Sequence, residues 1–102
     1  MARRFSEADL PGQRPDWREL VLVCGKCQRK RDRPSFRDDL RRSLKTAGFS
    51  DRFRVVETTC MDICPKDGIT IVRGSEIGGI VPLVRVVGPD TDPHDVARWL
   101  IG

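Results

Sequence analysis

The sequence predicts one α/β domain in which a mixed β-sheet is layered with helices. The chain has 102 residues, the ordinary size of a single domain, and 38% of them are hydrophobic. Apolar runs typical of strands and segments of helical periodicity follow one another in the order strand, helix, strand, strand, strand, helix. Because the first helix joins two strands, a right-handed crossover makes those strands parallel. We therefore expect a four-stranded mixed sheet with two main helices.

The first half of the predicted domain is a strand, a helix and a second strand. Residues 20–23 form a continuous apolar run, as in a strand that is buried on both faces. After a basic loop, apolar residues recur at helical spacing over 35–47, where Ser35 and Asp38 predict an acidic variant of the capping box. Residues 54–58 predict the second strand.

The second half of the predicted domain is a hairpin followed by a helix. Residues 69–72 predict a third strand, which a longer hairpin loop over 74–79 joins to a fourth strand over 80–87. Pro82 cannot donate a backbone hydrogen bond, so it places the fourth strand near an edge. Asp92 predicts the cap of a last helix, with a proline at the first helical position.

The N-terminal residues differ from the rest of the chain. Residues 1–18 hold two prolines, a glycine and mostly polar side chains, so we expect a flexible arm before a folded domain over 19–102. No apolar segment suggests a secretory signal, and no run approaches the ~20 apolar residues of a membrane span. We expect a cytoplasmic protein with no membrane contact. The formal charge is +4, but aromatic residues are few and tyrosine is absent, so nucleic-acid binding is not expected.

Four cysteines form two close pairs, each directly after a predicted strand. Cys24 and Cys27 form a C-x2-C pair, and Cys60 and Cys64 form a C-x3-C pair. Structural disulfides are rare in a reducing compartment, so the cysteines indicate metal or redox chemistry. Since the first two strands are parallel, both pairs should lie beyond the same sheet edge. Four thiolates suit either an iron–sulfur cluster or zinc.

Two other interpretations of the cysteines remain open. They could be ordinary buried side chains, although the residues between them are typical of loops rather than of a core. Alternatively, Cys24 and Cys27 could act as a thiol–disulfide oxidoreductase at a strand-to-helix junction. Against that function, the predicted helix begins well after Cys27, and Cys60 and Cys64 would have no role.

The segment Val55–Pro65, VVETTCMDICP, followed by the strand Ile69–Val72, carries a resemblance to a known family. Together with the predicted strand and helix before it, it resembles the thioredoxin-like [2Fe-2S] ferredoxins, which include the small iron–sulfur subunit beside the flavoprotein of respiratory complex I and of some hydrogenases. The resemblance covers about residues 19–101. It implies a thioredoxin-like ferredoxin fold and a metal-binding domain over 19–102.

The resemblance also implies a ligand set. Cys60 and Cys64 would bind one iron, and Cys24 and Cys27 the other. The first pair is closer in sequence than is usual in the family. That short spacing suits zinc, and it is shared by a group of small bacterial proteins described as predicted metal-binding.

These observations predict a single-electron carrier that holds one [2Fe-2S] cluster and is not an enzyme by itself. The alternatives are a zinc-stabilised interaction module and the thiol–disulfide oxidoreductase. Basic residues near the first pair predict a docking surface for a larger redox protein with an acidic contact face, although they could also be a solvated helix face. The sequence leaves homodimer formation open. The basic residues are Lys26, Arg29, Lys30, Arg31, Arg33, Arg37, Arg41, Arg42 and Lys45.

Overall fold

The computed structural model describes residues 8, 11–61, 63, 65 and 67–102. Its strands are β1 (Glu19–Cys24), β2 (Phe53–Thr58), β3 (Ile69–Arg73) and β4 (Arg85–Val87), and its helices are α1 (Gly25–Lys30), α2 (Phe36–Thr46), α3 (Gly74–Ile77) and α4 (Pro93–Ile101). Over the described residues the chain is therefore a mixed α/β domain with a four-stranded mixed sheet and four helices. Residues 1–7, 9 and 10 of the predicted arm lie outside this description.

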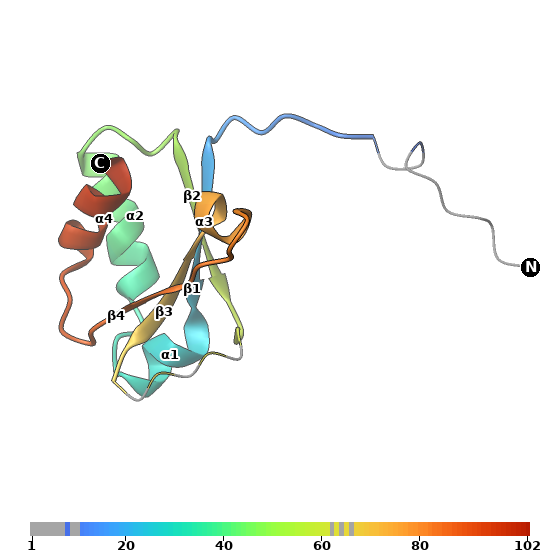
Figure 1. Cartoon of the computed structure of the whole chain (residues 1–102). Helices are drawn as coiled ribbons and strands as arrows, with labels where there is room; N and C mark the ends of the chain where they lie inside the picture. The colour runs from blue at the N-terminus through green and yellow to red at the C-terminus, as the bar shows by residue number, and fades with distance from the viewer. Residues whose placement is uncertain (1–7, 9–10, 62, 64, 66) are drawn as a thin grey trace, which may run out of the picture.

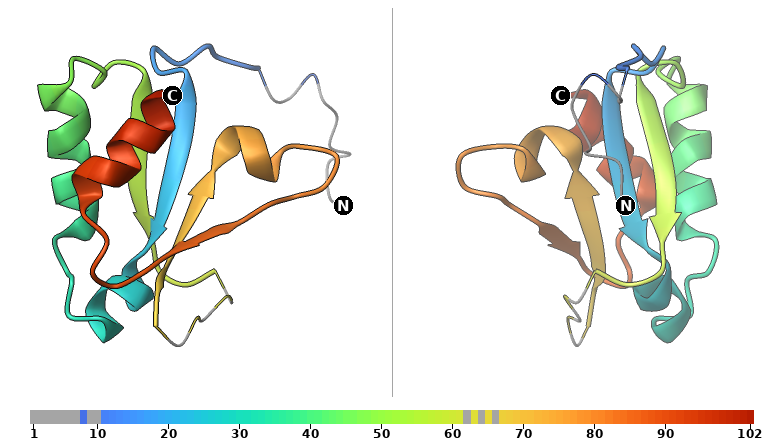
Figure 2. Two further views of the ribbon diagram at one scale, coloured as in Figure 1. Left: turned by 60° about the vertical axis from the view of Figure 1, so that its left-hand side comes forward. Right: turned by 90° about the vertical axis from the view of Figure 1, so that its right-hand side faces the viewer.

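The sheet has the strand order β2-β1-β3-β4 (Figure 1). Strand β1 runs parallel to β2 and antiparallel to β3, and β4 runs antiparallel to β3. The parallel pairing of the first two strands confirms the crossover expected from the sequence. Both long helices, α2 and α4, pack together on one face of the sheet (Figure 2). None of the described helices has the length and apolarity that crossing a membrane requires.

The hydrophobic core lies between the sheet and the two long helices. Strand side chains alternate between the two faces, so Val21 and Val23 of β1 point toward the helices and have no exposed surface. Leu22, on the other face, is half-buried, which means that the expected burial on both faces of this strand is wrong. Removing each core side chain from water contributes about 1.5–3 kcal/mol. The core is completed by Cys24, Cys27, Phe36, Leu40, Leu44, Val55, Ile69, Ile71, Val96, Ala97 and Leu100.

Helix α2 occurs where it was predicted, but its first turn is capped differently. Ser35 is the N-cap residue, yet its side chain makes no capping hydrogen bond, so the predicted capping box is wrong. The backbone amide of Arg37 instead donates to Oε1 of Gln28 at 2.9 Å. A side chain from the preceding helix therefore satisfies one of the open amides of α2. At α4 the prediction is confirmed, because Asp92 accepts from the amide of His94 at 2.9 Å.

The residues after Cys24 form helix α1, where the sequence predicted a basic loop. Cys24 is the N-cap residue, and its sulfur accepts a hydrogen bond from the Cys27 amide at 3.5 Å. The usual N-cap residues are Ser, Thr, Asp and Asn. Cysteine gives no such signal in a sequence, which explains why this helix was not predicted.

The hairpin between β3 and β4 also differs from the prediction. Residues 74–77 form the short helix α3 rather than a loop, and the fourth strand covers Arg85–Val87 rather than 80–87. The amide of Leu83 donates to the carbonyl of Glu76, which turns the chain back toward α3 instead of extending the strand. Pro82 lies before β4, and β4 is an edge strand, as expected.

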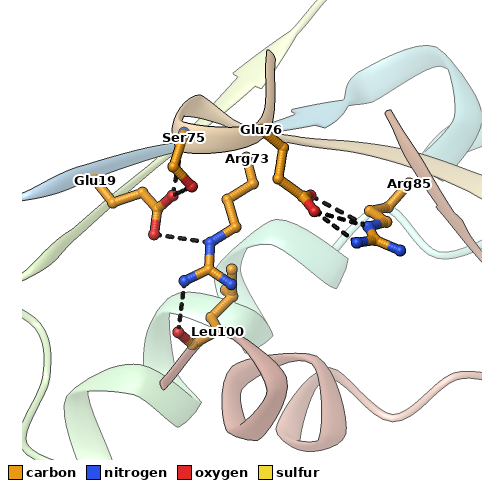
Figure 3. A network of polar contacts seen from close by, with 6 residues as sticks. All are labelled: Glu19, Arg73, Ser75, Glu76, Arg85 and Leu100. Carbon is orange, nitrogen blue, oxygen red and sulfur yellow. Dashed lines mark hydrogen bonds and ion pairs between the residues drawn. The ribbon is translucent and has the colours of Figure 1, made fainter. Parts of the chain in front are cut away.

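A polar network ties the start of β1 to the end of β3 (Figure 3). Glu19 accepts from Nε of Arg73 at 2.8 Å and also from the backbone amide and the hydroxyl of Ser75. The same arginine donates from Nη2 to the carbonyl of Leu100 at 3.0 Å. Glu76 and Arg85 form a further ion pair beside it, at 2.6 Å. These hydrogen bonds connect strands β1 and β3 with helices α3 and α4. The ion pair between Glu76 and Arg85 connects α3 with β4.

Candidate metal centre

The first cysteine pair lies where β1 passes directly into α1. Cys24 is the last residue of the central strand, and Cys27 lies in the first turn of the helix. Both side chains are buried, with 1% and 6% of their surface exposed, and no disulfide joins them. The strand and the helix turn both cysteines toward the same end of the sheet.

The second cysteine segment begins beside the first pair because β2 is parallel to β1. Thr58, the last residue of β2, is the register partner of Cys24. The amide of Lys26 donates to the carbonyl of Thr59 at 3.2 Å, next to Cys60. A Cβ atom on Gly25 would lie 2.6 Å from the carbonyl oxygen of Thr58, so a glycine is needed for α1 to approach β2 this closely.

Three of the four cysteines line one cavity of about 190 Å³. They are Cys24, Cys27 and Cys60, and the wall is completed by Lys26, Lys30, Arg31 and Pro65. Cys64 lies outside the described residues. Within the described part of the chain, no three side chains of Cys, His, Asp or Glu are grouped so that they could hold one metal ion together.

A larger groove of about 1060 Å³ runs along α2 and β2. Its wall contains acidic and basic side chains together with Trp17 and Phe53, but no cysteine. The smaller cavity is the candidate site, because it is the one that gathers soft sulfur ligands from two segments distant in the sequence.

Two polar side chains with no exposed surface support the cysteines, and the sequence analysis did not single them out. Gln28 donates from Nε2 to the carbonyl of Cys24 at 3.4 Å and to Oε1 of Glu57 at 2.8 Å. Thr70 lies 3.8 Å from the sulfur of Cys27 and donates its hydroxyl to the carbonyl of Ile63 at 3.0 Å. Burying a polar group costs free energy unless it is hydrogen-bonded, and these two are bonded to the cysteine segments.

The two buried thiols differ in acidity. Burial raises the pKa of Cys24 and outweighs the hydrogen bonds that its sulfur receives from the backbone. Burial also acts to raise the pKa of Cys27, but a backbone hydrogen bond from Thr70, a hydrogen bond from Cys24 and the charge of Arg31 lower it by more. The pKa of Cys27 therefore lies below its usual value. Of the two thiols, Cys27 ionises first and is the readier metal ligand.

Two buried hydrogen-bond donors near the cysteines have no partner among the described residues. They are Nε of Arg31, whose side chain lines the cavity, and Oγ1 of Thr58, the register partner of Cys24. A buried polar atom without a partner is costly. Thiolates and inorganic sulfides are acceptors for such donors, so the Nε atom of Arg31, whose side chain lines the cavity, fits an anionic metal–sulfur group.

The basic residues predicted to form one docking surface divide into separate groups. Lys26, Lys30 and Arg31 line the cavity. Arg33 instead donates to the carbonyls of Pro89 and Thr91, which ties the loop before α2 to the loop before α4. The cations of α2 lie apart from the cavity: Arg37 pairs with Asp38 and Arg42 with Asp39, and Arg41, Arg42 and Lys45 line the larger groove.

No protein-family model, curated protein or solved structure matches this chain.

Proposed function

We propose that this protein is a single-electron carrier that holds one [2Fe-2S] cluster on Cys24, Cys27, Cys60 and Cys64. The observation that carries the proposal is the cavity that three cysteines line from two strand ends. Four thiolates are the usual ligand set of such a cluster. Cys64, the fourth ligand, follows from the sequence spacing and from the family resemblance.

Each part of the site has a role in this proposal. When bound, the cluster would supply reversible one-electron chemistry. Cys24 and Cys27 would bind one iron from a buried position that excludes water, and Cys60 and Cys64 would bind the other. Cys60 is more exposed than the first pair, so the second segment offers the shorter path to the surface. Arg31 would donate a hydrogen bond that stabilises negative charge on sulfur.

The arrangement of the sheet supports the finer part of the fold prediction. The order β2-β1-β3-β4, the parallel first pair and the two long helices on one face agree with a thioredoxin-like ferredoxin fold. We propose that fold for residues 19–102. The described part of the segment between β2 and β3 contains no helix that could cover the second face of the sheet. This segment carries Cys60 instead.

The proposed partner is a larger cytoplasmic redox protein with an acidic contact face. Lys26, Lys30 and Arg31 border the cysteine cavity, so their charge would attract such a face toward the electron-transfer site. Long-range attraction of this kind raises the association rate more than it raises the affinity.

Metal analysis of the full chain tests the proposal most directly. Protein purified without air, or reconstituted with iron and sulfide, should be red-brown and contain about two irons and two acid-labile sulfides per chain. Chemical reduction should bleach the visible absorption and give the paramagnetic signal of a one-electron-reduced cluster. Zinc at one ion per chain without sulfide, in protein never exposed to air or chelator, would support the zinc-stabilised interaction module instead.

One observation favours a second function, the thiol–disulfide oxidoreductase. Cys24 caps helix α1, which begins at Gly25, so the expected distance between the first pair and a helix is wrong, and Cys27 has a lowered pKa. Both features are typical of redox-active C-x-x-C pairs. This function predicts that metal-free protein reduces a model disulfide with catalytic turnover in the presence of dithiothreitol, and that Cys27→Ser abolishes the turnover while Cys60→Ser does not.

A further inference from the structure

Two carbonyls of the second cysteine segment are held by side chains from other elements. Thr70 of β3 donates to the carbonyl of Ile63 at 3.0 Å, and Nη2 of Arg31 donates to the carbonyl of Pro65 at 2.6 Å. Ile63 and Pro65 flank Cys64 in the sequence. The two hydrogen bonds therefore hold the backbone carbonyls of the residues before and after Cys64, a proposed ligand.

Thr70 also reaches the first cysteine pair. Its Oγ1 atom lies 3.8 Å from the sulfur of Cys27. A hydroxyl has one donor and two acceptor positions, so in the metal-free protein it can donate to Ile63 while it accepts from the thiol, and in a metal-bound thiolate state the bond to Ile63 would remain. Thr70 is wholly buried in β3, which pairs with β1 on one side and β4 on the other. This one side chain bridges the two cysteine segments from a rigid strand.

Arg31, the C-cap residue of α1, also connects the first cysteine pair with the second cysteine segment. Its backbone amide donates to the carbonyl of Cys27 at 3.0 Å, so its position is fixed relative to the first pair. A hydrogen bond from a charged guanidinium to a carbonyl is stronger than one between neutral groups. The bond to Pro65 therefore links the end of α1 to the far side of the second segment.

We infer that Arg31 and Thr70 are positioning residues that hold the second cysteine segment against the first pair. The inference rests on the proposed metal centre, and it assigns roles to two residues that are not themselves metal ligands. The segment between β2 and β3 has no helix or strand in its described part, so regular secondary structure does not fix the position of Cys60. Groups behind the ligands commonly fix ligand geometry in metal sites.

The experiment compares four single variants of the full chain. Thr70→Val keeps the shape of the side chain and removes the hydroxyl, whereas Thr70→Ser keeps the hydroxyl. Arg31→Gln removes the charged donor at the C-cap of α1, and Arg29→Gln removes an equal charge from an exposed position in the last turn of α1. Metal release to a chelator is measured for each protein, whichever metal it carries. Hydrogen exchange of residues 59–68 is measured in the metal-free chain.

Thr70→Val and Arg31→Gln should each weaken metal binding by about 10–100-fold and speed metal release accordingly. They should also raise hydrogen exchange in residues 59–68 without metal. Thr70→Ser and Arg29→Gln should behave like the wild type in both assays. Exchange outside this segment should be unchanged in all four variants, which separates a local effect from general loss of stability.

Wild-type release and exchange in both Thr70→Val and Arg31→Gln would overturn the inference. An equal effect of Arg29→Gln and Arg31→Gln would overturn it as well, because the cause would then be charge alone. If Thr70→Val does not fold, Thr70→Ser and the arginine pair still decide the result. A zinc-containing wild type would contradict the proposed cluster but leave this comparison valid, and exchange in metal-free protein does not depend on any metal.

Discussion

The side-chain amide of Gln28 lies 3.4 Å from the carbonyl oxygen of Cys24, and its own oxygen accepts from the Arg37 amide. One buried residue thus joins the first cysteine to the start of α2. Gln28→Ala should destabilise the fold by about 2–4 kcal/mol, because it opens a cavity and leaves buried polar groups unpaired. Denaturant unfolding measures the loss. The exposed Gln13→Ala is the control, and an equal effect of both variants would show that Gln28 has no special role.

The N-cap residues of α2 and α4, Ser35 and Asp92, should differ in how much they stabilise the protein. Asp92→Ala should cost about 1 kcal/mol, since its side chain caps α4. Ser35→Ala should cost less than about 0.5 kcal/mol, since its side chain makes no capping hydrogen bond. Thermal or denaturant unfolding of both variants checks the difference. A larger loss in Ser35→Ala than in Asp92→Ala would contradict the capping of α2 by Gln28.

The carboxylate of Glu19 makes stability depend on pH in the acidic range. Burial raises its pKa, but the hydrogen bonds from Ser75 and Arg73 lower it by more, so the folded-state pKa lies below the unfolded value. The stabilisation is therefore fully present above the unfolded pKa and is lost as the pH falls through the folded pKa. Unfolding free energy measured from neutral to strongly acidic pH should decrease in that window.

Glu19→Gln provides the test of this assignment. The variant should lose about 1–3 kcal/mol at neutral pH, because Arg73 then lacks its charged partner. It should also show a flatter decrease of stability toward acidic pH. Asp90→Asn, at an exposed position, should leave both the stability and its pH dependence unchanged. If the two variants have the same pH profile, the network in Figure 3 does not cause the acid sensitivity.

Replacement of Cys60 should remove metal binding and lower the stability of the loaded protein. Cys60, after β2, lines the same cavity as the pair after β1, so a metal bound there as proposed would contribute to folding. Cys60→Ser should therefore melt at the same temperature with or without metal in the buffer, whereas the wild type should melt higher with metal. Unchanged metal content in Cys60→Ser would remove this residue from the site.

The cations beside the cavity should make electron exchange sensitive to salt. Exposed charges are screened over about 8 Å at physiological ionic strength, so oxidation of the reduced protein by an anionic reagent should slow as salt rises. Lys26→Glu with Lys30→Glu should slow this oxidation at low salt and speed oxidation by a cationic reagent. Arg41→Glu with Lys45→Glu makes the same charge change on α2. Equal rates in the two double variants would show that net charge alone controls the exchange.

The elements that the sequence predicted well are those with a clear periodic pattern or a usual cap. The apolar run of β1 and the helical spacing of α2 gave their positions closely, and the crossover rule gave the parallel pairing. Helix α1 was missed because a cysteine caps it, and β4 was predicted too long because apolar residues 80–84 continue its pattern without pairing. The cysteine cap is a local contact of an unusual kind. The length of β4 is decided by its pairing with β3, which no local signal reports.

In the candidate site, too, some features could be predicted from the sequence and others could not. Strand order places Cys24, Cys27 and Cys60 around one cavity, since parallel strands end side by side. Gln28 and Thr70 were missed because their partners come from distant segments. A signal did exist for Thr70, which is a polar residue inside the apolar strand β3. The signal for Gln28 was its position one helical turn after Cys24, which is visible only once α1 is known.

The parallel pairing of β1 and β2 has a consequence for the order of events during synthesis. The first cysteine pair leaves the ribosome early, but the register of Cys24 with Thr58 exists only after the whole of β2 has emerged. Until then a nascent chain presents two thiols without the opposite half of the site. In the proposed centre, stable metal insertion would follow formation of this long-range strand pair, and a chain that stalls between α2 and β2 would present the first two thiols without Cys60.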